Sequence, residues 1–144
     1  MSVLLSQFFL EAVRTEFAFL VEQYGFSGPY WDLSSYVDKV WFMGKNLAIE
    51  FTFEWRDQDI SCLIVRLEDG KMPSGWAVNE KGERVRIYLA VWLQERGIHE
   101  PLFTEIRPKN IEEEIKIRIK DYKKILKKYG HDILHDRADV VFGS

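Results

Sequence analysis

The chain has 144 residues, of which 47% are hydrophobic and 15% aromatic, so it is long enough for one folded domain and too apolar to be disordered. Its net charge of −3 argues against the strongly basic surface that nucleic-acid binding needs. No apolar run reaches the roughly 20 residues that span a bilayer. A start without a basic signal-peptide region and a single cysteine, Cys62, favour the cytoplasm and exclude an intrachain disulfide. We therefore expect one cytoplasmic domain over residues 1–144.

The first element in chain order is a helix. Hydrophobic residues recur every three or four positions from Leu5 to Tyr24, which is the spacing of one helix face. Gly25 supplies the left-handed residue that ends many helices. The next segment, residues 27–32, contains glycine and proline and is therefore predicted to be a loop.

A β-hairpin follows over residues 36–55. Its second half, Leu47–Trp55, alternates large apolar residues with small or charged ones at every position, as a strand with one buried face does. This pattern places Phe51 and Phe53 in the core, and it places Glu50 and Glu54 on a face that points to water.

The register of the hairpin depends on the turn at Gly44-Lys45-Asn46. If Gly44 and Lys45 are the two central residues of the turn, Val40 faces Ile49, and Lys39 forms an opposite-charge pair with Glu50. Asp38 then falls on the apolar face, where a carboxylate fits poorly. We therefore expect Asp38 near the margin of the sheet.

The second half of the chain begins with a strand over residues 60–67. This strand is apolar at nearly every position, so it is expected to be covered on both faces or to lie in the middle of the sheet. A long connection runs to Gly82. Residues 83–96 fit both periodicities: a helix is favoured, and a fourth strand at 84–93 is the alternative. A last long helix begins near Ile111.

These elements predict an α+β fold. The expected sheet is an antiparallel meander of three to four strands with one face covered by helices, in the order α-β-β-β-α-α. No repeat or low-complexity tract interrupts the chain.

Residue types with catalytic or metal-binding chemistry do not form a recognisable motif. His131 and His135 lie four positions apart, as in a zinc-protease helix, but Asp132 stands where the general-base glutamate would be, and a third ligand is missing. Cys62 has no histidine partner or helix N-terminus to activate it. We therefore expect no catalytic residue, no metal site and no cofactor, and hence no enzyme.

Charge is distributed unevenly along the chain. Residues 1–69 carry 11 acidic and 5 basic side chains, whereas residues 107–128 carry 9 basic and 4 acidic ones. The basic helix reads as a solvated surface, and nucleic-acid binding is not expected. The acidic half could attract a cationic partner, or its carboxylates could be the solvated face of a sheet. Likewise, the tryptophans in loops could be interface anchors, or they could pack against the protein's own surface. The candidate partner-binding residues are Glu50, Glu54, Asp57, Asp59, Trp31 and Trp76.

Several segments resemble a group of small bacterial proteins that are similar to the immunity proteins of toxin systems. These segments are residues 17–26, the hairpin 40–55, residues 64–70, and the end of the chain at 122–129 and 132–134. Immunity proteins bind a cognate toxin and neutralise it. The resemblance rests on packing and turn residues, so it assigns no binding residue.

The expected function is therefore stoichiometric protein binding without catalysis. The resemblance implies an immunity protein that neutralises a bacterial toxin by steric and electrostatic occlusion. One alternative is a structural protein that self-associates as a homodimer through a strand edge or Trp41. Another is a small-ligand or enzyme domain, which predicts a deep pocket holding a residue of perturbed pKa.

Overall fold

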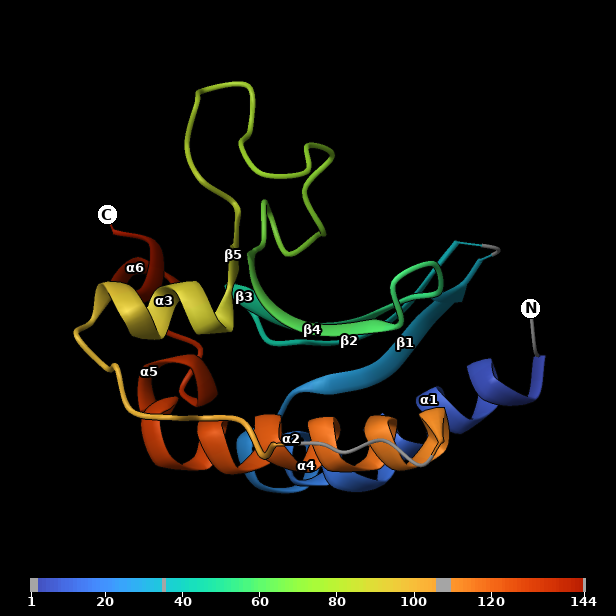
Figure 1. Ribbon diagram of the computed structural model, residues 1–144. Helices are drawn as coiled ribbons and strands as arrows, with labels where there is room; N and C mark the ends of the chain where they lie inside the picture. Colours follow the sequence, from blue (N-terminus) through green and yellow to red (C-terminus); the bar gives the residue numbers. More distant parts are fainter. Residues whose placement is uncertain (1–2, 35, 106–109, 144) are drawn as a thin grey trace.

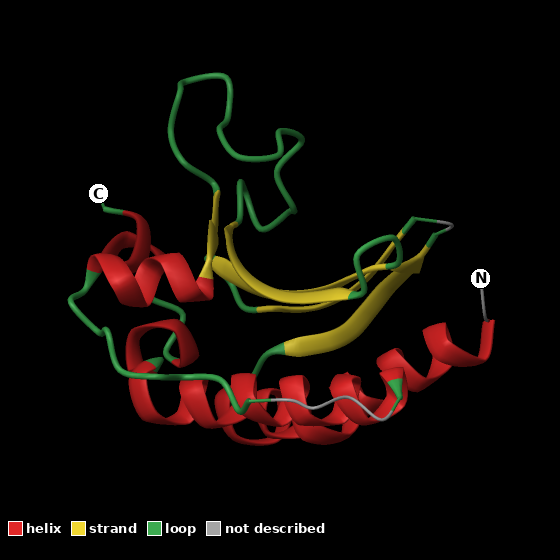
Figure 2. Ribbon diagram, viewed as in Figure 1, coloured by secondary structure: helices red, strands yellow, loops and turns green. Residues whose placement is uncertain are grey.

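Five antiparallel strands form a meander sheet in chain order in the computed structural model, which describes residues 3–34, 36–105 and 110–143 (Figures 1 and 2). The strands are β1 (Ser27–Leu33), β2 (Val37–Met43), β3 (Leu47–Glu54), β4 (Asp59–Arg66) and β5 (Arg86–Tyr88). The helices are α1 (Val3–Glu16), α2 (Ala18–Tyr24), α3 (Leu89–Glu95), α4 (Ile111–Tyr129), α5 (His131–Leu134) and α6 (Ala138–Phe142). Helices α1, α2 and α4 lie along one face of the sheet, and the loop 67–85 projects from the opposite side (Figure 1).

The α+β class and the antiparallel meander are confirmed, but the sheet has five strands within the described residues instead of three or four. The additional edge strand, β1, was wrongly predicted to be a loop because it contains Gly28-Pro29. The β1–β2 register shifts between Ser27 and Tyr30, and a proline is tolerated on an edge strand, where its missing N–H need not pair. Gly28 has a φ of 124°, and a Cβ there would lie 2.9 Å from the carbonyl oxygen of Trp41, so glycine is required at this close approach.

Residues 83–96 form both of the predicted structures in succession. Strand β5 pairs with β4 through Ile87 and its two neighbours, and helix α3 begins at the next residue, Leu89. The segment fitted both the strand and the helix periodicity because it contains the junction between β5 and α3. The first predicted helix is also divided, because α1 ends at Glu16 and α2 begins at Ala18, and α2 ends at Gly25 with a φ of 76° as expected.

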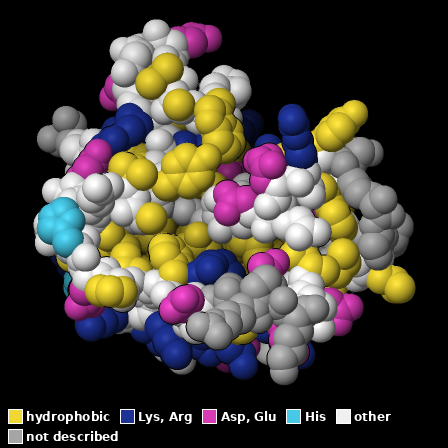
Figure 3. All heavy atoms as spheres, viewed as in Figure 1, with side chains coloured by type: hydrophobic (Ala, Val, Ile, Leu, Met, Phe, Trp, Pro, Cys, Tyr) yellow, Lys and Arg dark blue, Asp and Glu magenta, His cyan; other side chains and the backbone are white. Residues whose placement is uncertain are grey.

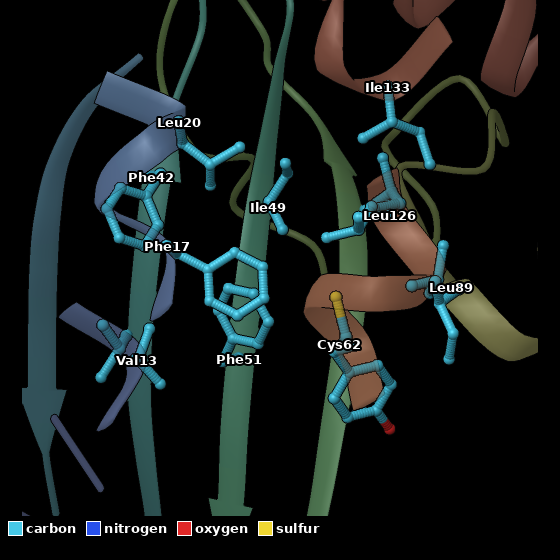
Figure 4. Packing of buried hydrophobic residues seen from close by; sticks show 14 of the residues in the cluster. Val13, Phe17, Leu20, Phe42, Ile49, Phe51, Cys62, Leu89, Leu126 and Ile133 are labelled. Atoms are coloured by element: carbon cyan, nitrogen blue, oxygen red, sulfur yellow. The ribbon is translucent and has the colours of Figure 1, made fainter. Parts of the chain in front are cut away.

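The core lies between the helices and one face of the sheet, here called the helix-covered face. Phe51 and Phe53 are fully buried there, as the alternation of β3 predicts. The Phe17 ring lies 4.4 Å from the Phe51 ring between their centroids, and Cys62 and Leu126 continue the same layer (Figure 4). None of the described helices is both long and apolar enough to cross a membrane.

Asp38 lies near the sheet margin, as expected, because it is the second residue of β2 and pairs with Leu33 at the end of β1, and it is buried on this apolar face. It is fully inaccessible, and its carboxylate accepts hydrogen bonds from Ser6 Oγ at 2.8 Å and Trp55 Nε1 at 3.0 Å. Burial raises the pKa of Asp38, although these two hydrogen bonds oppose the shift. Polar partners from α1 and from Trp55 thus offset part of the cost of burying this carboxylate.

The β2–β3 register differs by two residues from the predicted one. Val40 lies opposite Phe51, Met43 lies opposite Ala48, and the Gly44 N–H donates to the carbonyl oxygen of Leu47 at 2.8 Å, so the two central residues of the turn are Lys45 and Asn46 instead of Gly44 and Lys45. A register shift of two residues keeps every side chain on its predicted face, so the predicted core residues of the hairpin are the observed ones. The C-terminal segment stabilises the turn in this position: the Asp136 carboxylate accepts hydrogen bonds from the backbone N–H groups of Lys45, Asn46 and Leu47 at 2.7–3.0 Å.

We predict that Asp136→Asn destabilises the protein by about 2 kcal/mol, because the neutral amide loses charge-assisted hydrogen bonds that hold the hairpin turn. Asparagine also tolerates the left-handed backbone of this position, where φ is 62°. Urea unfolding measures the change. Asp139→Asn, an exposed aspartate in α6, is the control and should alter stability by less than about 0.5 kcal/mol. Equal effects of the two substitutions would contradict this role.

Candidate binding face

The sheet face opposite the helices carries side chains in four cross-strand rows, which follow from the register. At the end of the sheet where β3 turns into β4, Glu54 lies beside Asp59, and the next row is Asp32, Lys39, Thr52 and Ser61. The third row crosses all five strands as Tyr30, Trp41, Glu50, Leu63 and Tyr88. The last row is Met43, Ala48, Val65 and Arg86. The face therefore passes from acidic, through aromatic, to apolar.

The loop 67–85 covers the apolar end of this face. Ala48 and Val65 are fully buried and pack with Leu67 and Met72 of the loop in a small second core. The hydrophobic character of β4 is thereby explained, because β4 is buried on one face by helices and on the other by this loop, as its sequence predicted. The other end of the sheet, where β3 turns into β4, lies beyond the projecting loop (Figure 1).

Glu50 is buried, which corrects the prediction that it points to water. Its side chain is 2% exposed, and its Oε1 lies 3.5 Å from Nε of Arg86, whose side chain is 9% exposed. Lys39, the predicted partner, lies opposite Thr52. A carboxylate is tolerated at this depth because β5 returns a guanidinium to the same face after the long loop.

Arg86 also fixes the tip of the loop. Its Nη1 donates hydrogen bonds to the carbonyl oxygens of Gly75 at 2.8 Å and of Trp76 at 3.0 Å. Its guanidinium lies 4.9 Å from the centre of the Trp76 ring, and Lys39 Nζ approaches the same ring at 5.9 Å. Because these cations belong to β5 and β2, the indole lies over the middle of the sheet, above the row that contains Glu50. Trp76 is nevertheless 52% exposed.

Further aromatic side chains surround this position. Tyr30 and Trp41 are neighbours across β1 and β2, with stacked rings 6.1 Å apart, and Tyr88 stands at the opposite end of the same row. Tyr30 and Tyr88 are both exposed, and the Tyr30 hydroxyl donates to Ser27 Oγ. We call the surface formed by Tyr30, Trp41, Trp76 and Tyr88 the aromatic face. Figure 3 shows hydrophobic side chains beneath the projecting loop, with acidic side chains beside them.

Three carboxylates gather where β3 turns into β4, and we call Glu54, Asp57 and Asp59 the acidic end. The Asp57 side chain hydrogen-bonds Glu54 and raises its pKa, because such a bond favours the protonated carboxyl. Partial desolvation and the charges of Asp57 and Asp59 act in the same direction, while Arg56 opposes them. The acidic end is thus a place of mutual repulsion beside the aromatic face.

The candidate residues from the sequence are largely brought together. Glu50, the acidic end and Trp76 share this side of the sheet, although Glu50 lies beneath the surface. Trp31 does not join them: it belongs to the helix-covered side of β1, where Arg14 of α1 approaches its ring at 5.8 Å. Arg86 and Tyr88 were missed because their segment could not be assigned to one periodicity.

The residues with possible catalytic chemistry lie apart from this face. His131 and His135 stack on each other with ring centroids 4.1 Å apart, and His135 also contacts Tyr24. Burial raises the pKa of the Cys62 thiol well above its usual range. Within the described ranges, histidine, cysteine and carboxylate side chains nowhere form a group of three that could hold a metal ion.

Comparison of the chain with models of protein families, with curated proteins and with solved structures finds no match.

We predict that Arg86→Met destabilises the protein by roughly 3 kcal/mol, because it leaves the Glu50 charge buried without its cation. Adding Glu50→Leu should recover much of this loss, since an apolar pair replaces the isolated charge. Chemical denaturation of the two single variants and the double variant measures the coupling. Arg84→Met, which removes the exposed pair with Glu95, is the control and should have little effect. Additive effects of the two substitutions at Glu50 and Arg86 would refute the pairing.

We also predict that Glu54 titrates above the ordinary glutamate pKa in the folded protein and that Asp57→Asn lowers its midpoint, because the like charge that opposes its ionisation is removed. Carbon-detected NMR of the side-chain carboxyl measures both titrations. Because the pKa of Glu54 is higher in the folded than in the unfolded state, the folded protein binds this proton more tightly. Glu54 therefore stabilises the folded state fully below its unfolded-state pKa, and this contribution is lost as the pH rises through its folded-state pKa. An unchanged midpoint in the variant would show that Asp57 is not the cause.

Proposed function

We propose that this protein is a non-catalytic protein-binding domain and that the aromatic face is its contact surface. The observation that supports this most strongly is the state of Trp76, which is half exposed although Arg86 and its own backbone hold it in place. Tryptophan and tyrosine are enriched among the residues that dominate protein–protein binding energies. A ring that is already fixed loses little conformational entropy on binding, so more of the contact energy remains as affinity.

The resemblance to immunity proteins supports a more specific form of the proposal, in which the partner is a bacterial toxin. The protein would then act stoichiometrically, covering the toxin's working surface with the aromatic face and the acidic end. Trp31 lies outside this surface, so it is not included among the proposed contacts.

The small-ligand alternative receives less support from the described residues. Three cavities of about 290 to 320 Å³ lie away from the aromatic face. One lies between α1 and α4, and two lie beside the β2–β3 turn that Asp136 contacts. The first is lined by Phe8 and Ala12 with glutamates from α1 and lysines from α4. None of the groups with a shifted pKa lines these three cavities. An enzyme site would be expected to bring such groups together.

The self-association alternative centres on β1, which is the longer of the two edge strands of the sheet. Its exposed Tyr30 and Trp31 could bury area in a dimer. Pro29 and the register shift near it interrupt the straight row of backbone groups that a second strand would need. We therefore favour a different protein as the partner over a second copy.

Photo-cross-linking tests the proposal. We predict that Trp76→p-benzoylphenylalanine cross-links one protein at equal stoichiometry in cells of the source organism, because position 76 lies in the contact. Excess wild-type protein should suppress the product, and excess Tyr30→Ala protein should suppress it less. Val140→p-benzoylphenylalanine, at an exposed position on α6, is the control and should give no such product. A product of two copies of this chain, or equal products from positions 76 and 140, would contradict the proposal.

A further inference from the structure

Two classes of macromolecule could use a sheet face that displays aromatic rings. Proteins contact such rings in interface hot spots, and single-stranded nucleic acids stack their bases on them. The sequence places Phe51 and Phe53 of β3 in the core, which argues against a sheet that stacks bases on its aromatic residues. The structure weakens that argument, since other strands and the loop place Tyr30, Trp41, Trp76 and Tyr88 on the opposite face.

The sign of the surrounding charge separates the two classes. On the open half of the face, Asp32, Glu54 and Asp59 point to the same side as the aromatic rings, and Asp57 adjoins them in the turn. The basic residues there are Lys39 and Arg56. The loop 67–85 also has more acidic than basic residues. Phosphate groups would be repelled by such a surface, whereas lysine and arginine side chains would be attracted.

The cations of the face are moreover engaged within the protein. Arg86 is held by Glu50 and by the carbonyl oxygens of Gly75 and Trp76, and Lys39 approaches the Trp76 ring. They are therefore poorly placed to bind an anion. At the acidic end, by contrast, the pKa of Glu54 is raised by its hydrogen bond with Asp57, by desolvation and by the charges of Asp57 and Asp59, and Arg56 only opposes this shift.

We infer that the aromatic face docks a positively charged protein segment, whose apolar part covers Trp76 and its neighbours while its lysines or arginines contact the acidic end. This inference rests on the proposed function and adds the chemistry of the partner. The charges act over about one Debye length, roughly 8 Å at physiological salt, so the acidic end should speed association and make binding depend on ionic strength.

Fluorescence anisotropy with three labelled probes tests the inference. The probes are a twelve-residue peptide that alternates lysine with valine, the same peptide with glutamate in place of lysine, and a twelve-nucleotide oligouridylate. We predict that wild-type protein binds the lysine peptide at least tenfold more tightly than either of the others. Raising the salt concentration from 50 to 300 mM should weaken this binding at least tenfold, because exposed charges are screened.

Two matched triple variants locate the interaction. Glu54→Gln with Asp57→Asn and Asp59→Asn should weaken lysine-peptide binding at least tenfold. Glu22→Gln with Glu112→Gln and Glu113→Gln makes the same change of net charge at exposed helix positions and should weaken it less than twofold. Arg56→Gln removes the cation within the acidic end and should tighten binding severalfold, a gain that misfolding cannot produce.

The outcomes separate this inference from the proposed function. Preferred binding of the oligouridylate, salt-independent peptide binding or equal losses in the two triple variants would overturn the cationic partner. If position 76 nevertheless cross-linked a protein, the binding domain would stand and only its partner's charge would be wrong. If position 76 cross-linked none, the proposed function and this inference would both fail.

Discussion

The buried ion pair between Glu50 and Arg86 is the constraint on which the second side of the sheet depends. Glu50 lies in the central strand, where an isolated carboxylate would be costly to bury. Its cation arrives only because the loop 67–85 leads back to a short fifth strand that pairs with β4. The same guanidinium binds the carbonyl oxygens of Gly75 and Trp76. One side chain thus compensates the buried charge, closes the loop over the sheet and sets the position of the most exposed tryptophan.

Much of the fold could be predicted because local patterns determined it. The alternation of Leu47–Trp55 was sufficient to place Phe51 and Phe53 in the core, and the apolar run of β4 correctly indicated cover on both faces. The exact hairpin register was not predictable, because Asp136, from the other end of the chain, stabilises a turn centred on Lys45-Asn46 instead of Gly44-Lys45. Strand β1 was missed because the turn signal of Gly28-Pro29 is overridden by pairing with β2 at the sheet edge.

The binding face was only partly predictable for the same physical reason. The period-2 alternation of a strand predicts which face of the sheet a side chain occupies, but it does not predict what covers that face. Glu50 was assigned correctly to the face opposite the core and wrongly to water, because Arg86 and Trp76 come from a distant loop and strand. Tyr88 joins Tyr30 in one cross-strand row only when all five strands are paired. Trp31, one residue from Tyr30, falls on the other side.

The central claim is that Trp76 is held in one orientation before any partner binds. Fluorine NMR of protein labelled with 5-fluorotryptophan measures this most directly, with the Trp76 resonance assigned by Trp76→Phe. The account predicts one narrow Trp76 resonance in wild-type protein, and several or broadened resonances in Arg86→Met, where the loop has lost its cation. A Trp76 resonance that is already broad in the wild type, or that Arg86→Met leaves unchanged, would contradict it.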